Sequence, residues 1–415
     1  MTTAGTCDEN RRKDGRDHVS GPPHPVRRRE TRDHGGNGNP AQLIPRPPTH
    51  SSGISGIPAQ RDQDRGYCRG KRSGRLHTTR LIITAACVAA LAACGDDDAA
   101  DTPVTTEAPV TTEASVTTVD TTGSMIGQWT TAPSLLHPRA AHGVVATDDA
   151  IYVLGGIGED RRPVMEVERF DGATWADITT LPGKGVNAPS VATVGGKIYV
   201  IGGFSGTSNK PTDEVHVYDI ATSTWTTAAP LPTASGGHAA VVLDGRVHVV
   251  GGGTSQSTIA DHVVYDPATD AWTTAAPLSR PKGSPAVTVL DGRIWAVGGR
   301  SGHDDFGDVE IYDPATDQWT AGPEIEARGN AGAIAVCGTI LVAGGQQQRG
   351  SLVLDEVLVL DGDAWLPEPP LQVARAFARR VLFGDAVYVV GGSDKYGQSH
   401  ATPGSATVEF ATPDC

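Results

Sequence analysis

Residues 238–252 read HAAVVLDGRVHVVGG, two apolar segments joined by Asp244-Gly245 and ended by a pair of glycines. An Asp-Gly dipeptide between two apolar runs is a strong signal for a tight β-hairpin. The diglycine recurs after five other apolar segments, at spacings of 46 to 49 residues. The six pairs begin at residues 155, 202, 251, 298, 344 and 391. A fixed period of this length indicates a repeat protein.

A tryptophan recurs with the same period. The six copies are Trp129, Trp175, Trp225, Trp272, Trp319 and Trp365. Between a diglycine and the next tryptophan lies an acidic-apolar segment such as DEVHVYD at 213–219, often followed by a turn such as PATD at 267–270. Each unit therefore predicts four short strands. Because one small sheet cannot bury both of its faces, we expect the sheets to stack radially around an axis.

The apolar strand, the diglycine and the tryptophan together resemble the kelch repeat over about 290 residues. This resemblance implies a β-propeller. The sixth copy contains Gly391-Gly392 but no later tryptophan, whereas Trp129 has no diglycine before it. We therefore expect an all-β, six-bladed kelch β-propeller over residues 125–415, closed by an N-terminal strand around 128–131 in the last blade.

The composition agrees with many short strands and turns. The 415 residues include 51 glycines and only 20% charged residues, which argues against a helical bundle. Residues 1–80 carry 16 Lys/Arg against 8 Asp/Glu, whereas residues 81–415 carry 18 against 40. An acidic body of this size repels phosphate backbones, so we expect no nucleic-acid binding.

The first 124 residues lack the repeat pattern. Residues 1–70 have no apolar period, which predicts disorder. Residues 71–94 combine a basic stretch with the apolar segment LIITAACVAALAA at 81–93, as in a secretory signal. Since a signal so far from Met1 is unusual, we expect translation to begin downstream of that residue. Residues 95–124, with repeated VTTEA units, predict a flexible Thr/Glu/Pro-rich tether.

The end of the apolar segment, Leu91-Ala92-Ala93-Cys94, resembles the lipobox of bacterial lipoproteins. The resemblance implies cleavage before Cys94 and lipidation of its thiol, hence an extracytoplasmic domain anchored to the cell membrane by lipid. An ordinary signal peptide with an incidental cysteine is the alternative. The apolar segment itself would be about 20 Å long as a helix, too short for a hydrocarbon core of ~30 Å.

Two cysteines lie within the repeats. Cys337 occupies the turn between the first two strands of the fifth copy, and Cys415 lies where a fourth strand of the sixth copy would begin. Both turns should lie on one face of adjacent blades, in a compartment that permits disulfides. A Cys337–Cys415 bridge and two unpaired cysteines both remain open, because disulfide geometry is strict. The sequence has no zinc-type ligand spacing, and we expect no metal or other cofactor.

The loop before each first strand supplies the candidate ligand-binding residues. The equivalent positions are Arg139, Val186, Ser235, Lys282, Arg328 and Arg375. The four cations among them, converging at a channel mouth, could bind a carboxylate or an acidic sugar. Alternatively they pair with acidic residues of the blades, since an arginine is common here in kelch repeats. The polar loops at 203–213, 300–308 and 393–406 are further candidates for binding.

The sequence thus favours a membrane-anchored extracytoplasmic kelch lipoprotein that acts as a monomeric protein- or glycan-binding module. Its partner would be a protein or an acidic or cell-wall glycan. An isomerase or mutarotase that acts on an acidic sugar at the basic channel mouth is the alternative. That alternative rests on similarity to the six-bladed periplasmic kelch mutarotase of sialic acid. No residue of the chain matches a catalytic motif, so catalytic residues stay unassigned.

Overall fold

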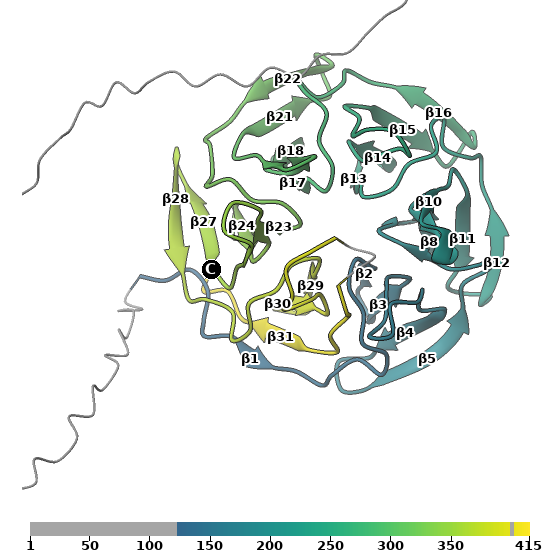
Figure 1. Cartoon of the computed structure of the whole chain (residues 1–415), viewed down its shortest axis with the longest axis horizontal. Helices are drawn as coiled ribbons and strands as arrows, with labels where there is room; N and C mark the ends of the chain where they lie inside the picture. The colour runs from purple at the N-terminus through teal and green to yellow at the C-terminus, as the bar shows by residue number, and fades with distance from the viewer. Residues whose placement is uncertain (1–122, 399–401) are drawn as a thin grey trace, which may run out of the picture. The chain divides into compact units, whose positions relative to one another are not determined.

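The computed structural model describes residues 123–398 and 402–415 (Figure 1). All described residues belong to the unit Glu107–Cys415. The segment expected to be disordered (1–70), the export signal with Cys94 and nearly all of the tether lie outside the described residues. Within those residues, no helix is both long and apolar enough to span a bilayer.

The described chain forms six antiparallel four-stranded sheets, here called sheets 1 to 6. Sheet 1 contains β2 (Gly143–Thr147), β3 (Ala150–Leu154), β4 (Glu166–Phe170) and β5 (Trp175–Thr180). Sheet 2 contains β7 (Ser190–Val194), β8 (Lys197–Ile201), β11 (Val215–Asp219) and β12 (Thr224–Thr227). Sheet 3 contains β13 (Ala239–Leu243), β14 (Arg246–Val250), β15 (His262–Asp266) and β16 (Ala271–Thr274).

The second half of the chain repeats this plan. Sheet 4 contains β17 (Ala286–Leu290), β18 (Arg293–Val297), β21 (Val309–Asp313) and β22 (Gln318–Ala321). Sheet 5 contains β23 (Gly332–Val336), β24 (Thr339–Ala343), β27 (Val357–Asp361) and β28 (Ala364–Glu368). Sheet 6 contains β29 (Arg379–Phe383), β30 (Ala386–Val390), β31 (Val408–Ala411) and β1 (Thr130–Thr131).

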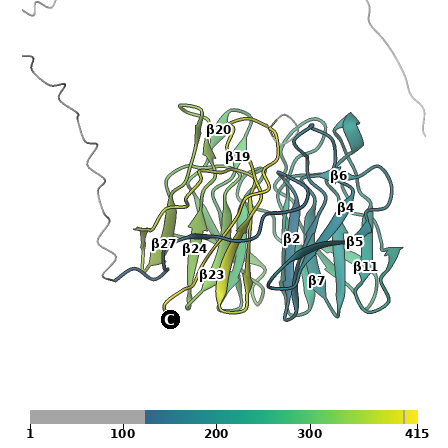
Figure 2. The same cartoon turned by 90° about the horizontal axis from the view of Figure 1, so that it is seen from below.

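The six sheets surround a common centre (Figure 1). Their first strands contact one another in the cyclic order β2, β7, β13, β17, β23 and β29, and β29 contacts β2. The remaining short strands are β6 (Val186–Asn187), β9 (Phe204–Ser205), β10 (Lys210–Pro211), β19 (Arg300–Ser301), β20 (Asp304–Asp305), β25 (Gln346–Gln347) and β26 (Leu352–Val353). Figure 2 shows β6, β19 and β20 at one end of the ring, here called the loop face, and the C-terminus at the opposite end.

The diglycines let neighbouring sheets approach closely. Gly251 and Gly252 follow β14 with φ angles of +68° and +110°, which side chains rarely adopt. A Cβ atom on Gly251 would lie only 2.4 Å from the carbonyl oxygen of Lys282, in the loop that leads into the next sheet. Any residue other than glycine would therefore push sheets 3 and 4 apart.

The tryptophans join each sheet to the preceding one. The indole Nε1 of Trp272 donates to the carbonyl of Ala229, four residues after the preceding tryptophan, at 2.8 Å. The other five tryptophans donate in the same way to the residue four positions after the preceding tryptophan. The pairs are Trp175–Pro133, Trp225–Thr179, Trp319–Ala276, Trp365–Pro323 and Trp129–Pro369. Thr179 accepts through its side-chain Oγ1, and the other four residues accept through their backbone carbonyls. The last of these pairs links the first tryptophan of the sequence to the end of sheet 5.

The N-terminal segment of the described chain is part of the last sheet. Strand β1 pairs with β31, placing Thr130 opposite Phe410 and Thr131 opposite Glu409. Trp129 is 3% exposed and packs in a core cluster that includes Leu341 of sheet 5 and Val389 of sheet 6. Strand β1, which precedes sheet 1 in the chain, thus completes sheet 6, whose other three strands come from the C-terminal end of the described chain.

Cys337 and Cys415 form a disulfide, with their Cα atoms 5.4 Å apart. Cys337 lies in the β23–β24 turn with a left-handed φ of +52°, and Cys415 is the last residue of the chain. Of the two alternatives left open by the sequence, the structure contains the bridge. It fastens the chain end that follows β31 to sheet 5.

Replacing both cysteines by serine should lower the free energy of unfolding by about 4 kcal/mol, because the bridge closes a loop across a sequence separation of 78 residues in the unfolded chain. Urea denaturation at pH 7, with and without reductant, measures the effect. Reductant should destabilise the wild type and leave the double variant unchanged. Equal stability of the two proteins without reductant would contradict a structural role for the bridge.

Candidate functional site

The four cations predicted at the channel mouth are buried in ion pairs. Arg139 and Lys282 are 0% exposed, Arg328 is 1% exposed and Arg375 is 2% exposed. Their partners are acidic residues on, or just before, the third strand of the same sheet. The ion pairs are Arg139–Glu168 at 2.5 Å, Lys282–Glu310 at 2.8 Å, Lys282–Asp308 at 2.5 Å, Arg328–Glu356 at 2.5 Å, and Arg375–Glu409.

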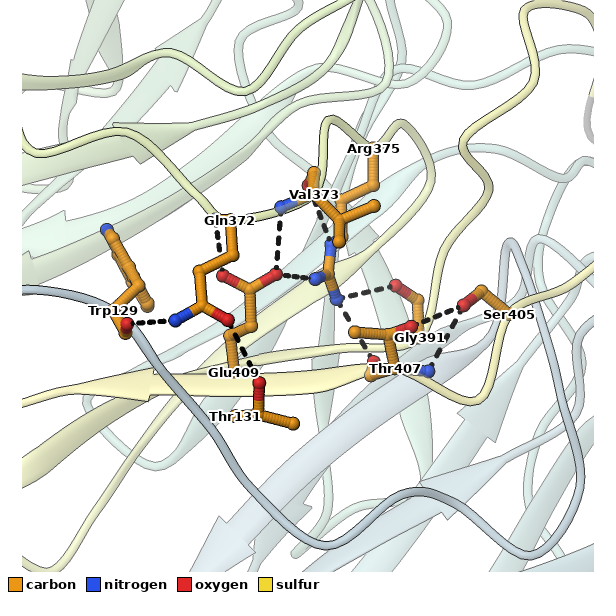
Figure 3. Close-up of polar contacts among 9 residues, drawn as sticks. All are labelled: Trp129, Thr131, Gln372, Val373, Arg375, Gly391, Ser405, Thr407 and Glu409. Atoms are coloured by element: carbon orange, nitrogen blue, oxygen red, sulfur yellow. Dashed lines mark hydrogen bonds and ion pairs between the residues drawn. The ribbon is translucent and has the colours of Figure 1, made fainter. Parts of the chain in front are cut away.

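The Arg375 pair shows what such a contact does (Figure 3). The Arg375 guanidinium bonds Glu409 and also donates to the carbonyls of Thr407 at 3.0 Å and Val373 at 3.2 Å. Glu409 in turn accepts from the backbone N–H of Gln372 at 2.8 Å. The pair therefore fixes the connection between sheets 5 and 6 onto strand β31.

The same network reaches the N-terminal segment. The side-chain nitrogen of Gln372 donates to the backbone carbonyl of Trp129 at 2.6 Å, and Thr131 Oγ1 donates to the side-chain oxygen Oε1 of Gln372 at 2.9 Å (Figure 3). The Arg375–Glu409 pair is thus linked through Gln372 to the segment that contains β1, and it supports the pairing of β1 with β31. The role of the pair in this arrangement is structural.

The repeats contain an internal comparison that supports this conclusion. Where the cation is replaced, at Val186 and Ser235, the aligned third-strand positions hold His216 and Val263, with no carboxylate. Where the cation is present, that position holds Glu168, Glu310 or Glu409, except in sheet 5, where it holds Leu358 and Arg328 bonds Glu356 two residues earlier. At the position of Glu168, a carboxylate occurs only in sheets that have the cation, as expected of structural pairs. The position of Glu356 is acidic with or without the cation, as Glu214 and Asp261 show.

The assignment of Arg139, Lys282, Arg328 and Arg375 as ligand-binding residues is therefore corrected. Each side chain has its counter-charge inside the protein and is shielded from solvent. The second alternative from the sequence, pairing with acidic residues of the blades, describes the structure. A ligand in the channel has to meet other residues.

Two residues beyond each of these positions, the backbone forms a ring around the channel, here called the collar. Its members have left-handed φ angles of 48° to 63°, and they are Ala141, Ala188, Gly237, Ser284, Asn330 and Phe377. Each of three consecutive members donates its N–H to the preceding one, with Ser284 to Gly237 the shortest at 2.6 Å. Phe377 donates to Asn330, and Ala141 donates to Phe377 at 3.2 Å, across the junction of sheets 6 and 1.

Next to the collar, the six first strands line a cavity of about 110 Å³. Two charged side chains line it, those of Arg379 and Arg380 at the start of β29. The five other sheets place small or apolar pairs at the same two positions, namely Gly143-Val144, Ser190-Val191, Ala239-Ala240, Ala286-Val287 and Gly332-Ala333. The pair was not predicted from the sequence, because the predicted cations lie in the preceding loop, although Arg-Arg is unique to the sixth copy at these positions.

A second candidate site opens on the loop face, where a cavity of about 650 Å³ separates loops of sheets 4, 5 and 6. We call it the loop-face cavity. Its lining comprises His303, Asp304, Asp305, Glu326, Ala327, Gln347, Gln348, Arg349 and Tyr396. The residues from the predicted 300–308 and 393–406 loops therefore do meet at one site.

The loop-face cavity combines charged and amide groups with an aromatic wall. Gln347 Nε2 donates to Glu326 Oε1 at 3.0 Å, and Gln348 Nε2 donates to Asp305 Oδ1 at 3.4 Å, so two walls are tied together. Tyr396 is 37% exposed and Asp304 is also exposed. Among residues 123–398 and 402–415, no cluster of three His, Cys, Asp or Glu side chains has the arrangement of a metal site.

Comparisons with known proteins agree with the repeat pattern. Residues 105–285 match the KLHDC2/KLHL20/DRC7 Kelch-repeats domain, and residues 281–325 match the Kelch motif. The chain is 32% identical over 142 residues to Kelch-like protein terF of Aspergillus terreus, covering 30% of this chain and 31% of that protein. It is 35% identical over 131 residues to Kelch-like protein 35 of Mus musculus, covering 31% and 22%.

Two further proteins are similar, one in sequence and one in structure. The N-acetylneuraminate epimerase of Pasteurella multocida is 33% identical over 133 residues, which is 30% of this chain and 33% of that enzyme. The chain thus spans a third or less of these curated relatives. The solved structure titled "Structure of YjhT" superposes with a TM-score of 0.57 and 18% identity over 68% of this chain and 96% of that one. With the recurring diglycines and tryptophans, these matches show that the chain is built from kelch repeats on a β-propeller fold.

Proposed function

We propose that this protein is an extracytoplasmic, lipid-anchored kelch lipoprotein that acts as a binding module and holds its partner in the loop-face cavity. In this proposal the six sheets are the blades of one closed propeller. The β1–β31 pairing and the Cys337–Cys415 disulfide hold the ring together. The disulfide also supports an oxidising compartment outside the cytoplasm, and the lipobox-like Cys94 supplies the anchor.

The loop-face cavity is the observation that carries the proposal. Its volume of about 650 Å³ lies in the range of ligand-binding clefts. Three loops from different sheets build it, so a rigid scaffold positions a chemically varied surface. Tyr396 offers a flat apolar face, and Asp304 offers an exposed carboxylate in the same cavity. We infer that the partner is a protein segment with a basic side chain that bonds Asp304 and an apolar group that packs on Tyr396.

Site-specific photo-crosslinking in intact cells tests this proposal. A photoreactive residue at position 396 should trap a discrete protein, whereas the same residue at exposed position Asp291, in the β17–β18 turn, should not. Equal labelling from both positions, or none, would contradict a partner in this cavity. A ladder removed by muramidase would identify a cell-wall glycan instead of a protein.

The trapped partner then allows a quantitative comparison with purified components. Asp304→Lys should weaken binding by about tenfold or more, because it places like charges in contact. Asp291→Lys adds the same charge on a turn of the same sheet and serves as the control. Unchanged affinity of the Asp304 variant would rule out the assigned contact.

A second candidate function is an isomerase acting on an acidic sugar. The similarity to an N-acetylneuraminate epimerase favours it, together with the two arginines in the central channel. NMR of N-acetylneuraminate with the purified protein would show faster interconversion of its anomers or epimers. A rate equal to that in buffer alone would eliminate this candidate without affecting the binding-module proposal.

A further inference from the structure

We propose that the central channel contains a binding site for a small oxyanion, a carboxylate, sulfate or phosphate group, held by Arg379 and Arg380. This site is separate from the loop-face cavity and does not depend on the function proposed for it. The inference rests on uncompensated charge, on free hydrogen-bond donors and on the space left by the other five sheets.

The charge of the channel pair is uncompensated. Within residues 123–398 and 402–415, no carboxylate lies within ion-pair distance of either guanidinium, whereas nearby Arg375 and Arg139 each bond a glutamate. Arg380 is only 9% exposed, and Arg379 is half-buried. Two cations shielded from water in this way without a counter-ion are costly in free energy. An anion in the cavity that both residues line would lower that cost.

The Arg379 guanidinium retains donors for such an anion. Arg379 Nε donates to the carbonyl of His142 at 3.0 Å, which leaves its terminal nitrogens for a ligand. Arg380 donates through its terminal nitrogens to the carbonyls of Ala378 and Ala343, and its Nε is buried. Arg380 therefore contributes positive charge to the site, and Arg379 contributes the hydrogen bonds. The carbonyls orient the two side chains but carry no net charge.

The neighbouring sheets leave room for both side chains and for a small ligand. A Cβ atom on Gly332, at the start of β23, would lie 2.3 Å from Cδ of Arg380, so only glycine there admits this arginine. The remaining space of about 110 Å³ is well below the volume of ordinary small-molecule pockets. It therefore suits a small oxyanion, or the charged end of a larger ligand, and not a whole sugar ring. Guanidiniums match oxyanions by paired hydrogen bonds.

A second cavity lies on the collar side of the site. It has a volume of about 130 Å³ and is lined by the collar residues together with Arg300 and Arg379, so Arg379 lines both cavities. Arg300 lies in the β19–β20 hairpin opposite Asp305, which offsets its charge. The uncompensated positive charge is therefore that of Arg379 and Arg380, on a chain whose net charge is −14.

Burial lowers the pKa of Arg379 to about 10 and the pKa of Arg380 to about 9. Both side chains therefore remain protonated at neutral pH. Since an anion favours the charged form, its binding raises both pKa values again. Affinity should accordingly stay constant around pH 7, because a guanidinium keeps its proton there.

Thermal unfolding and calorimetry of the purified full-length protein test the site. Sodium sulfate and sodium acetate are compared with sodium chloride at equal ionic strength. We expect a saturable rise in Tm with at least one oxyanion, and a loss of affinity of about 10- to 100-fold in both Arg379→Gln and Arg380→Gln. Arg293→Gln is the matched control, since Arg293 is an exposed residue paired with Asp313.

Each outcome decides the proposal. Binding of sulfate without acetate identifies a tetrahedral inorganic anion, and binding of acetate identifies an organic carboxylate. A chloride effect equal to that of the oxyanions, an equal effect in the Gln variants, or no saturable effect overturns the assignment. The variants should unfold at the wild-type temperature or above it when no anion is added, because each removes an unpaired buried charge. Arg379→Lys, which keeps the charge without the paired donors, should bind more weakly than wild type.

Discussion

Replacing Glu409 by glutamine will lower the free energy of unfolding by about 3–5 kcal/mol, the cost of leaving one partner of a buried ion pair uncompensated. Glu409 is 0% exposed and Arg375 is 2% exposed, so water cannot replace the lost charge. The variant would also weaken the bonds to the backbone N–H groups of Gln372 and Val373. Urea denaturation at pH 7 measures the difference.

Two controls separate this effect from a general loss of charge. Asp313→Asn breaks the exposed pair with Arg293 and should cost less than about 1 kcal/mol. The double variant Arg375→Met with Glu409→Leu removes both buried charges and should recover most of the stability. A loss below 1 kcal/mol for Glu409→Gln would mean that these ion pairs do not organise the ring.

Trp129→Ala will cost about 3–5 kcal/mol, as expected for removal of a buried aromatic side chain. The indole is 3% exposed, packs between sheets 5 and 6 and donates to the carbonyl of Pro369 at 2.9 Å. Because the contact joins the two ends of the folded region, its loss should open the ring at one place. Hydrogen exchange by mass spectrometry should show faster exchange in β1 and β31.

Trp225→Ala is the comparison variant for this experiment. Trp225 is half-buried and packs in the cluster shared by sheets 1 and 2. Its replacement should cost less and should increase exchange in those sheets. If Trp129→Ala raised exchange evenly around the ring, or left β31 protected, then the N-terminal segment would not be the fastening of the last sheet.

The sequence predicted the repeats well because two sets of residues with different roles share one period. Glycines such as Gly251 adopt a left-handed backbone conformation and let the next sheet come close. Tryptophans such as Trp272 donate a hydrogen bond to the preceding sheet. The missing tryptophan after Gly391-Gly392 and the unaccompanied Trp129 predicted a pairing of the two ends, and β1 pairs with β31. The repeat spacing is sufficient to predict such contacts, because residues at equivalent positions of the repeats make equivalent hydrogen bonds.

The candidate site was harder to predict, because alignment shows which residues are equivalent but not what their side chains contact. Arg375 was expected to face a ligand, and it bonds Glu409 instead. The absence of a carboxylate at Val263, in the copy where Ser235 replaces the cation, was a readable sign of this pairing. Arg379 and Arg380 adjoin in sequence, so strand alternation alone assigns them to opposite faces. The structure agrees, because Arg379 bonds His142 beside sheet 1 and Arg380 packs on Gly332 and bonds Ala343 of sheet 5, while both residues line the channel cavity.

The collar has a consequence for how this protein can diversify. Its ring is made by main-chain N–H and carbonyl groups, while residues as different as Ala188, Ser284 and Phe377 occupy its positions. Substitutions that tolerate the left-handed conformation can therefore change the chemistry around the pore without altering its aperture. Side-chain chemistry at the centre of the ring can thus change in evolution while the surrounding framework stays the same.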